Sequence, residues 1–88
     1  MLKPIYLKSF EKDLKRDSKR GKDIDKMRKV MKLLIEEKAL PDKFRNHKLK
    51  GNFVGYWECH VEPDWLLVYK KTQTEIIFVS TGTHSDLF

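Results

Sequence analysis

The apolar residues of this 88-residue chain change their spacing at Pro41. Before that proline they recur at steps of three and four residues, the period of one face of a helix. After it they alternate or run together, as in strands buried on one face or on both. The residues of the helical series are Ile24, Met27, Val30, Met31, Leu34 and Ile35. A chain of this length has room for one domain, so the change of period predicts a single α+β domain over residues 1–88.

The first half is expected to contain one short strand and two helices. Residues 3–8 alternate as a strand does. Ser9 is placed to cap a following helix over residues 10–20. The second helix is expected over residues 23–40, because the residue before a proline disfavours helical backbone. Its methionines lie on the apolar face, so we expect them in the core.

Four closely connected strands are expected in the second half. They cover residues 47–50, 55–61, 65–70 and 75–81. The third, with the sequence WLLVYK, is continuously apolar and is expected to be central and buried on both faces. The predicted order is therefore β-α-α-β-β-β-β, with the N-terminal strand and the two helices packed on an antiparallel sheet.

The directions of these strands bring four ionisable residues to one end of the sheet. Short connections make neighbouring strands antiparallel. Following the chain up and down then places His47, His60, Asp64 and His84 at the same end. The set contains all three histidines of the chain. A register error of two residues would move each group by only about 7 Å, so the shared end is a robust expectation.

Three kinds of chemistry could use such a set. Three histidines and an aspartate suit zinc, although their spacings match no compact ligand motif. Histidines titrate near neutral pH, so two of them can share the removal and donation of a proton while Asp64 orients one ring. The third alternative is a polar rim in which the histidines only cap strand ends. We favour acid–base chemistry, because all three histidines and the aspartate share one end beneath a basic half.

The remaining noteworthy side chains have simpler interpretations. Strand alternation places Trp57 and Cys59 on the face opposite the histidine of the same strand, so both are expected to pack in the core. Trp65 follows the turn at Pro63 and is either a core residue or a site residue. Asp86 has no evident role and is expected to be solvated.

The charge of the chain is unevenly distributed. Residues 1–50 contain 17 Lys and Arg against 8 Asp and Glu, whereas residues 51–88 contain 2 against 5, which together give the net +6. The basic half is either a solvated helical surface or the binding surface for nucleic acid or an acidic protein. No segment has the apolar length of a membrane span, the N-terminus lacks a signal peptide's apolar segment, and the single cysteine has no disulfide partner. We therefore expect a cytoplasmic protein with no membrane partner.

The second half of the chain carries a specific combination of motifs. The stretch NHKLKGNFVGYWECHVEPDWLLVYK, followed by TGTHSDLF, resembles the YafQ branch of the RelE superfamily of bacterial toxins. The resemblance covers nearly the whole chain, including both helices. It implies a RelE-like microbial ribonuclease-type fold.

The resemblance also implies an activity and partners. Such a toxin is an endoribonuclease, or mRNA interferase, that enters the ribosomal A site and cuts mRNA there without a metal or another cofactor. Its cognate antitoxin, expected to be a DinJ-like ribbon-helix-helix protein, would block it. Operator DNA would be bound only through the antitoxin complex.

The family's functional residues match positions of this chain one by one. His47 lies in NHKLKG, the CHVEPDW segment supplies His60, Asp64 and Trp65, and GTHSDLF supplies His84 and Phe88. We expect His84 to be the general acid and His60 or His47 the general base, with Asp64 orienting one of them. Trp65 and Phe88 are expected to contact RNA. The cations expected to contact RNA are Lys15, Arg16, Lys19, Arg20, Lys26, Arg28, Lys29, Lys32, Lys48 and Lys50.

One position departs from the family pattern. Many relatives have an arginine directly after the GY pair, where this chain has Trp57. The departure supports a rival hypothesis, in which the chain is a catalytically weak or inactive homologue that acts with its antitoxin as a co-repressor or binding module. A metal-dependent nuclease is a second rival.

Overall fold

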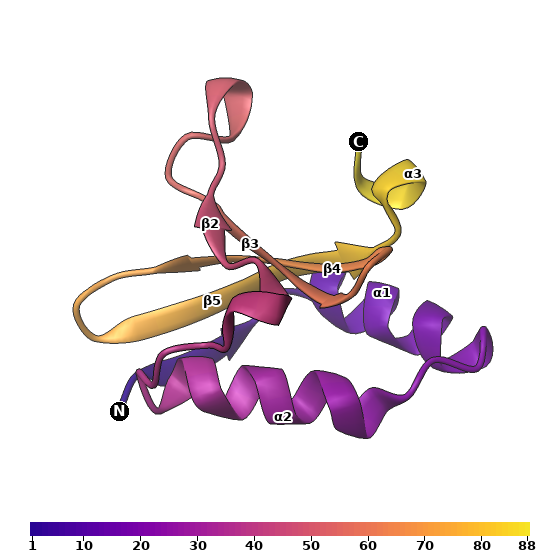
Figure 1. The fold of residues 1–88 in the computed structure, drawn as a ribbon, viewed down its shortest axis with the longest axis horizontal. Coiled ribbons are helices and arrows are strands. Elements are labelled where there is room, and N and C mark those ends of the chain that lie inside the picture. The colour runs from indigo at the N-terminus through magenta and orange to yellow at the C-terminus, as the bar shows by residue number, and fades with distance from the viewer.

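Five strands form one mixed sheet, and two helices cover one of its faces (Figure 1). The computed structural model describes residues 1–88. The elements are β1 (Lys3–Tyr6), α1 (Lys8–Lys19), α2 (Ile24–Ile35), β2 (His47–Lys48), β3 (Trp57–Glu62), β4 (Trp65–Lys71), β5 (Glu75–Gly82) and α3 (His84–Leu87), with the 3₁₀ turns η1 (Asp42–Phe44) and η2 (Gly51–Phe53). The α+β class and the order of the predicted strands and two long helices are confirmed.

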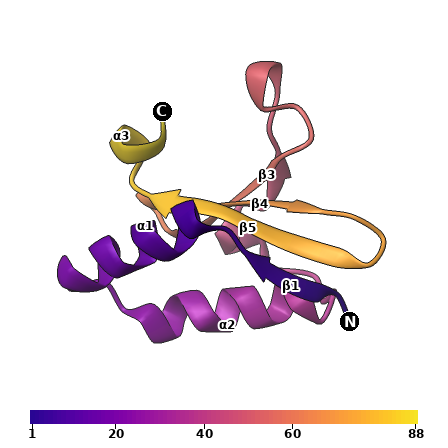
Figure 2. The ribbon, with the colours of Figure 1, turned by 180° about the vertical axis from the view of Figure 1, so that it is seen from behind.

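The strand order in the sheet is β1-β5-β4-β3-β2. The pairs among β2, β3, β4 and β5 are antiparallel, as predicted. The N-terminal strand differs, because β1 pairs with β5 in the parallel direction and makes the sheet mixed (Figure 2). Parallel neighbours need a long crossover, and here the rest of the fold between Tyr6 and Glu75 supplies it.

The central strand β4 separates two layers of buried side chains. Trp65, Leu67 and Tyr69 belong to the main core, which the apolar stripes of α1 and α2 complete. Leu66 and Val68 point to the opposite face and are also buried. The prediction that this strand is central and buried on both faces is confirmed.

Two predicted helix boundaries are wrong: the Ser9 cap of the first helix and the end of the second helix at Pro41. Ser9 does not cap α1, because the cap residue is Leu7 and the Ser9 hydroxyl instead donates to the carbonyl of Val79 at 2.6 Å. The helix α2 begins after Asp23, whose carboxylate accepts two backbone N–H groups. It ends at Ile35, well before Pro41.

The early end of α2 has a local cause. Glu37 takes a left-handed backbone conformation, with φ 59°. Its N–H donates to the carbonyl of Leu34, and the N–H of Lys38 donates to that of Leu33, which is the Schellman arrangement of a helix C-terminus. The N–H of Leu2, just before β1, donates to the carbonyl of Ile35 at 2.8 Å. The last turn is thus satisfied by the loop and by the N-terminal strand.

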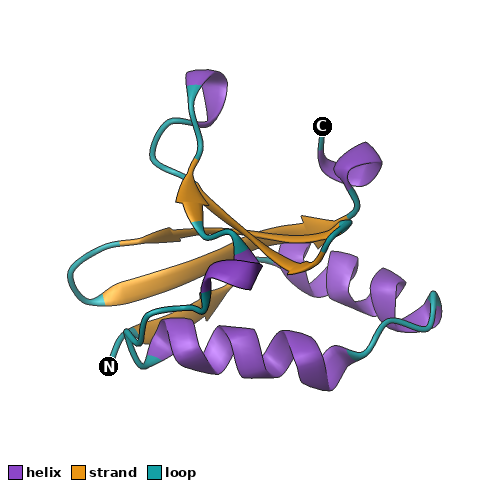
Figure 3. Cartoon of the chain, viewed as in Figure 1, coloured by secondary structure: helices purple, strands orange, loops and turns teal.

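Two short segments rise from the sheet face that α1 and α2 leave open (Figure 3). One is the β2–β3 connection with η2, and the other is α3, which the sequence did not predict. Thr83 and Asp86 start α3 with a capping box, in which each side chain accepts the backbone N–H of the other residue. No helix of the structure is long and apolar enough to cross a membrane.

The end of α2 generates a stability prediction. Replacing Glu37 with glycine should raise the free energy of unfolding by about 1 kcal/mol, because glycine adopts a left-handed conformation without steric cost. The carboxylate that is lost pairs only with the exposed N-terminal ammonium at 3.4 Å, which contributes little. Glu36→Gly is the matched control and should destabilise, since Glu36 has φ −80°. Urea denaturation of both variants tests this, and equal effects would contradict it.

Candidate active site

Strand pairing brings the imidazole rings of the three histidines into a row. His60 pairs with Leu66, which in turn pairs with Gly82, so β3 and β5 finish at the same end of the sheet, on either side of the start of β4. His84 follows β5 by two residues, and its ring centroid lies 5.6 Å from that of His60. On the other side, the ring of His47 lies 6.2 Å from that of His60. The structure therefore brings together the residues that the strand directions predicted to meet.

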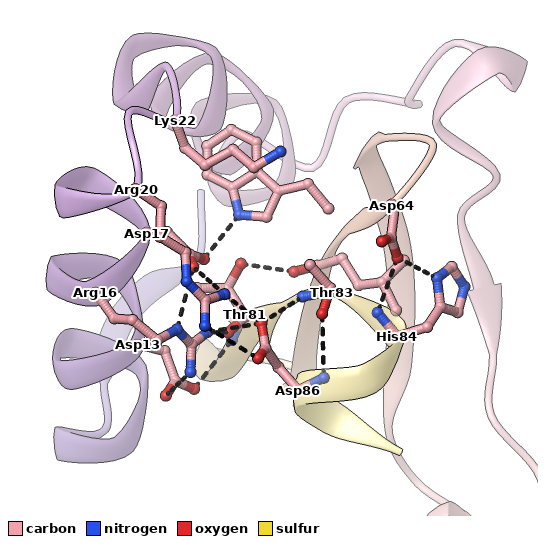
Figure 4. A network of polar contacts seen from close by, with 12 residues as sticks. Asp13, Arg16, Asp17, Arg20, Lys22, Asp64, Thr81, Thr83, His84 and Asp86 are labelled. Atoms are coloured by element: carbon pink, nitrogen blue, oxygen red, sulfur yellow. Dashed lines mark hydrogen bonds and ion pairs between the residues drawn. The ribbon is translucent and has the colours of Figure 1, made fainter.

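Asp64 holds His84 through two hydrogen bonds to one oxygen. Its Oδ1 accepts the His84 backbone N–H at 2.9 Å and lies 2.6 Å from the ring Nδ1 (Figure 4). These bonds, the backbone one first, hold the pKa of Asp64 below its ordinary value. A carboxylate at Nδ1 keeps the proton on that nitrogen, so Nε2 is the atom that can take or give a proton to a ligand. The His84 side chain is 56% exposed, which leaves Nε2 accessible.

A buried carboxylate joins the other two histidines. Oε1 of Glu58 lies 3.4 Å from Nε2 of His60 and 3.6 Å from Nε2 of His47. The opposite nitrogens face backbone carbonyls, since Nδ1 of His60 lies 3.3 Å from the oxygen of Pro63 and Nδ1 of His47 lies 2.6 Å from that of Arg45. Each ring is thus fixed at Nδ1 by a backbone carbonyl and has the Glu58 carboxylate near its Nε2.

Glu58 is a site residue that the sequence reasoning missed. Its side chain is only 7% exposed, and buried carboxylates are found where they have a partner. The signal was available, because strand alternation puts residues 58 and 60 on the same face. Two carboxylates therefore lie beside the row of histidines. Asp64 contacts His84 at one end, and Glu58 lies near both His60 and His47.

The expected RNA contact of Trp65 is wrong for this structure. The side chain is fully buried in the main core, so no base can stack on it. Its Nε1–H donates to Oδ2 of Asp17 at 2.9 Å, and Asp17 is itself 1% exposed. Trp65 instead ties the start of β4 to α1.

Asp86 is not solvated in the way the sequence suggested. Arg20 binds its carboxylate through both Nη atoms, at 2.7 and 3.3 Å, and Arg16 approaches it at 3.5 Å. The same carboxylate accepts the N–H of Thr83 at 2.9 Å. The Arg20 bonds, followed by that of Thr83, place the pKa of Asp86 well below its ordinary value. Asp86 therefore fastens α3 to α1 (Figure 4).

The close approach of these groups requires a glycine. A Cβ atom on Gly82 would lie 2.6 Å from Nη2 of Arg16 and 2.8 Å from Cβ of Asp86. Arg16 also donates to the carbonyl of Thr81 at 2.7 Å. The β5–α3 junction is thus packed directly against the arginines of α1.

The cations predicted to contact RNA divide into two groups. Those bonded to carboxylates within the fold are Arg16 and Arg20 to Asp86, Lys26 to Glu62, and Arg28 to Asp25. Arg16 in particular is a structural residue of the α1–β5–α3 junction. Those exposed and outside any ion pair are Lys15, Lys19, Lys29, Lys32, Lys48 and Lys50, of which Lys48 lies over the ring of Trp57. RNA contacts by this second group stay a prediction.

The aromatic and sulfur side chains near the site have clear positions. Phe88 is 56% exposed and meets the ring of Phe53 edge-on at 5.2 Å between centroids. Trp57 is half-buried and stacks on Tyr69, so its expected packing role is confirmed. Cys59 is fully buried in the core, as expected, and burial raises the pKa of its thiol to about 12.

The side chains of the histidine row determine what chemistry this candidate site can support. No group of three or more His, Cys, Asp or Glu side chains is arranged to hold a metal ion. One exposed imidazole is oriented by a carboxylate, and two further rings lie beside it. A ligand in front of this row would find groups able to remove one proton and to donate another.

Acid should release α3 from the sheet. Asp64 and Asp86 have pKa values below their ordinary value of 3.8, so their stabilising effect is complete above that value and is lost as the pH falls through the lowered values. We expect the amide signals of residues 84–88 to change below about pH 4, before the core unfolds. NMR titration tests this. An Asp64→Asn/Asp86→Asn variant should lack the transition, and a change that coincides with global unfolding in both proteins would contradict the interpretation.

Comparisons with known proteins show the family of this chain. A family model described as "Bacterial toxin of type II toxin-antitoxin system, YafQ" matches residues 2–88. The mRNA interferase toxin YafQ of Escherichia coli K12 is 44% identical over 84 residues, which cover 94% of this chain and 91% of that protein.

Solved structures show the same fold. In the crystal structure of the E. coli DinJ–YafQ complex, a chain with 42% identity matches with a TM-score of 0.94 and covers 100% of this chain and 99% of its own. A metal-bound toxin from Helicobacter pylori matches with a TM-score of 0.92 at 42% identity, over 100% of both chains. The chain therefore belongs to the YafQ family of toxins from bacterial type II toxin–antitoxin systems.

Proposed function

We propose that this chain is an mRNA interferase that cleaves ribosome-bound mRNA in the A site, in the cytoplasm, by metal-independent acid–base catalysis. The observation that carries the proposal is the exposed ring of His84, oriented by Asp64 and 5.6 Å from that of His60. The E. coli relative named an mRNA interferase toxin supports the substrate class.

The reaction uses the nucleophile that RNA itself carries. Nδ1 of His60 and of His47 faces a backbone carbonyl and carries the ring proton, so Nε2 of one of these rings takes the proton of a 2′-hydroxyl, and the 2′-oxygen attacks the adjacent phosphorus. The bond from phosphorus to the 5′-oxygen breaks, and His84 gives that oxygen a proton from Nε2. The products are a 2′,3′-cyclic phosphate and a 5′-hydroxyl, so atoms and charge balance without a cofactor.

The carboxylates keep the rings in the required orientation. Asp64 stabilises the protonated form of His84 before transfer, because an ionised carboxylate contacts Nδ1 at 2.6 Å. Glu58 contacts the other two rings and can stabilise whichever of them receives the proton of the 2′-hydroxyl. The phosphate charge in the transition state is then met by the imidazolium and by nearby lysines.

The basic surface binds the ribosome, and the antitoxin blocks the toxin. Exposed lysines on α1 and α2, such as Lys15, Lys19 and Lys29, are free to contact ribosomal RNA phosphates. The E. coli YafQ structure in complex with DinJ supports a DinJ-like ribbon-helix-helix antitoxin as the partner. Operator DNA is then bound through that complex.

Substitution of His84 tests the chemistry. His84→Gln should lower the rate of cleavage of ribosome-bound mRNA by about 10²–10⁴-fold, the usual contribution of a general acid or base. Lys38→Ala, on an exposed loop, is the matched control and should cleave as the parental chain does. Cleavage by His84→Gln at the parental rate, or products without a cyclic phosphate, would refute the mechanism.

Two further experiments address the rival functions. Cleavage should continue with a chelator that binds zinc and copper while the Mg²⁺ that ribosomes require is kept constant, and its loss would favour a transition-metal-dependent nuclease, a relevant alternative because the H. pylori relative is described as metal-bound. Induced expression should arrest growth with cuts at reproducible codon positions. A chain that binds its antitoxin but causes neither effect would be a binding module.

Removal of the last two residues tests the role of the C-terminus. Deleting Leu87 and Phe88 removes two backbone bonds of α3, from Leu87 to Thr83 and from Phe88 to His84, and the aromatic contact with Phe53. We expect cleavage to fall at least tenfold, with little change in the urea midpoint because neither residue belongs to the core. Full activity of the truncated chain would show that α3 needs no such support.

A further inference from the structure

A cavity opens beside His60, and no residue of α3 lines it. It has a volume of about 500 Å³, within the ~300–1,000 Å³ range of ligand sites, and lies between η1, the end of β3 and α2. It exists because β2 is only two residues long and pairs with Trp57 and Glu58 alone. Beyond Glu58, β3 has no strand on that side, so the side chains of η1 border an open space.

The charged groups around this cavity are not equivalent. Glu62 is bonded to Lys26 at 3.3 Å and to Lys22 at 3.2 Å, so both ammonium groups share its single negative charge. Lys43 and Arg45 also line the cavity, yet neither forms an ion pair. The Lys43 ammonium lies 5.1 Å from the ring centroid of Phe44. The cavity thus offers two uncompensated cations next to a histidine of the site, which suits an anionic ligand.

The backbone at Arg45 is unusual for its residue type. It is left-handed, with φ 46° and ψ 47°, and a side chain with a Cβ atom pays about 1–2 kcal/mol for that conformation. Glycine would adopt it without that penalty. The guanidinium makes no hydrogen bond that would stabilise the fold, whereas the backbone carbonyl contacts Nδ1 of His47 at 2.6 Å. The turn is needed for His47, but the arginine side chain is not needed for the turn.

We propose that the cavity beside His60 binds a phosphodiester of the substrate RNA next to the scissile phosphate, with Arg45 and Lys43 as the anion-binding side chains. The inference rests on the proposed function and names a subsite within it. RNA is favoured over an acidic protein segment because His60 lines both the cavity and the row of imidazole rings. An RNA segment in the cavity would therefore contact His60, one of the proposed reacting groups.

The Arg45→Gly variant removes the side chain without changing the turn. Glycine keeps the backbone conformation and the carbonyl that contacts His47, so the free energy of unfolding should stay equal or rise. The probe is a short oligoribonucleotide with a 2′-O-methyl group on every residue, which binds but cannot be cleaved. We expect its Kd to rise about tenfold at low salt, and the slope of log Kd against log salt to fall by about 0.7, the value for one single-strand phosphate contact.

The other variants complete the test. Arg45→Lys should retain most of the affinity, and Lys43→Ala/Arg45→Gly should lower the slope by about 1.4. Lys38→Ala removes one exposed cation remote from the cavity and should leave the slope unchanged. Equal slopes for the parental chain and Arg45→Gly, or no binding by the parental chain, would overturn the proposal. So would a loss of antitoxin affinity in Arg45→Gly with unchanged RNA binding.

Cleavage of ribosome-bound mRNA distinguishes the subsite from the function on which it rests. Arg45→Gly should raise KM about tenfold and leave kcat close to parental, because the acid and base are intact. A parental chain that binds the oligonucleotide but does not cleave mRNA would refute the proposed function. A parental chain that cleaves mRNA, with an unchanged KM in Arg45→Gly, would refute the subsite alone.

Discussion

The antiparallel course of β3, β4 and β5 is the constraint on which the candidate site depends. Two tight connections bring the end of β3, the β3–β4 turn and the end of β5 together at one end of the sheet. His60, Asp64 and His84 occupy those three places. Each residue alone would be an exposed polar group at a strand end. The pairing of the strands, which backbone hydrogen bonds and the buried side chains of β4 stabilise, turns them into one site.

The last five residues form part of that site only because carboxylates hold them. Chain ends usually fray, and a four-residue helix has too few internal bonds to persist alone. Here Asp64 binds the first residue of α3, while Asp86 binds both the cap residue Thr83 and Arg20 of α1. Two arginines of the basic half are thereby used inside the fold. The net positive charge therefore overstates the number of cations available to nucleic acid.

Those parts of the structure that follow from periodicity and strand direction could be predicted. The α+β class, the central strand β4 and the meeting of the histidines all depend on patterns spread over many residues. The errors concern features set by one side chain or by distant contacts. Whether Ser9 caps α1 and what Asp86 binds are decided by tertiary partners, namely the carbonyl of Val79 and the guanidinium of Arg20. Neither partner is near in sequence.

The adjacent residues Asp64 and Trp65 show why a motif alone does not assign contacts. Asp64 lies in the β3–β4 turn and directs its carboxylate to His84, whereas Trp65 is the first residue of β4 and its indole lies in the core. The indole nevertheless connects to the site, because its N–H binds Asp17, Asp17 lies 3.6 Å from Arg20, and Arg20 binds Asp86 at the start of α3. Trp65 can therefore affect cleavage through core packing and through this chain of bonds to the position of His84, rather than through contact with a base.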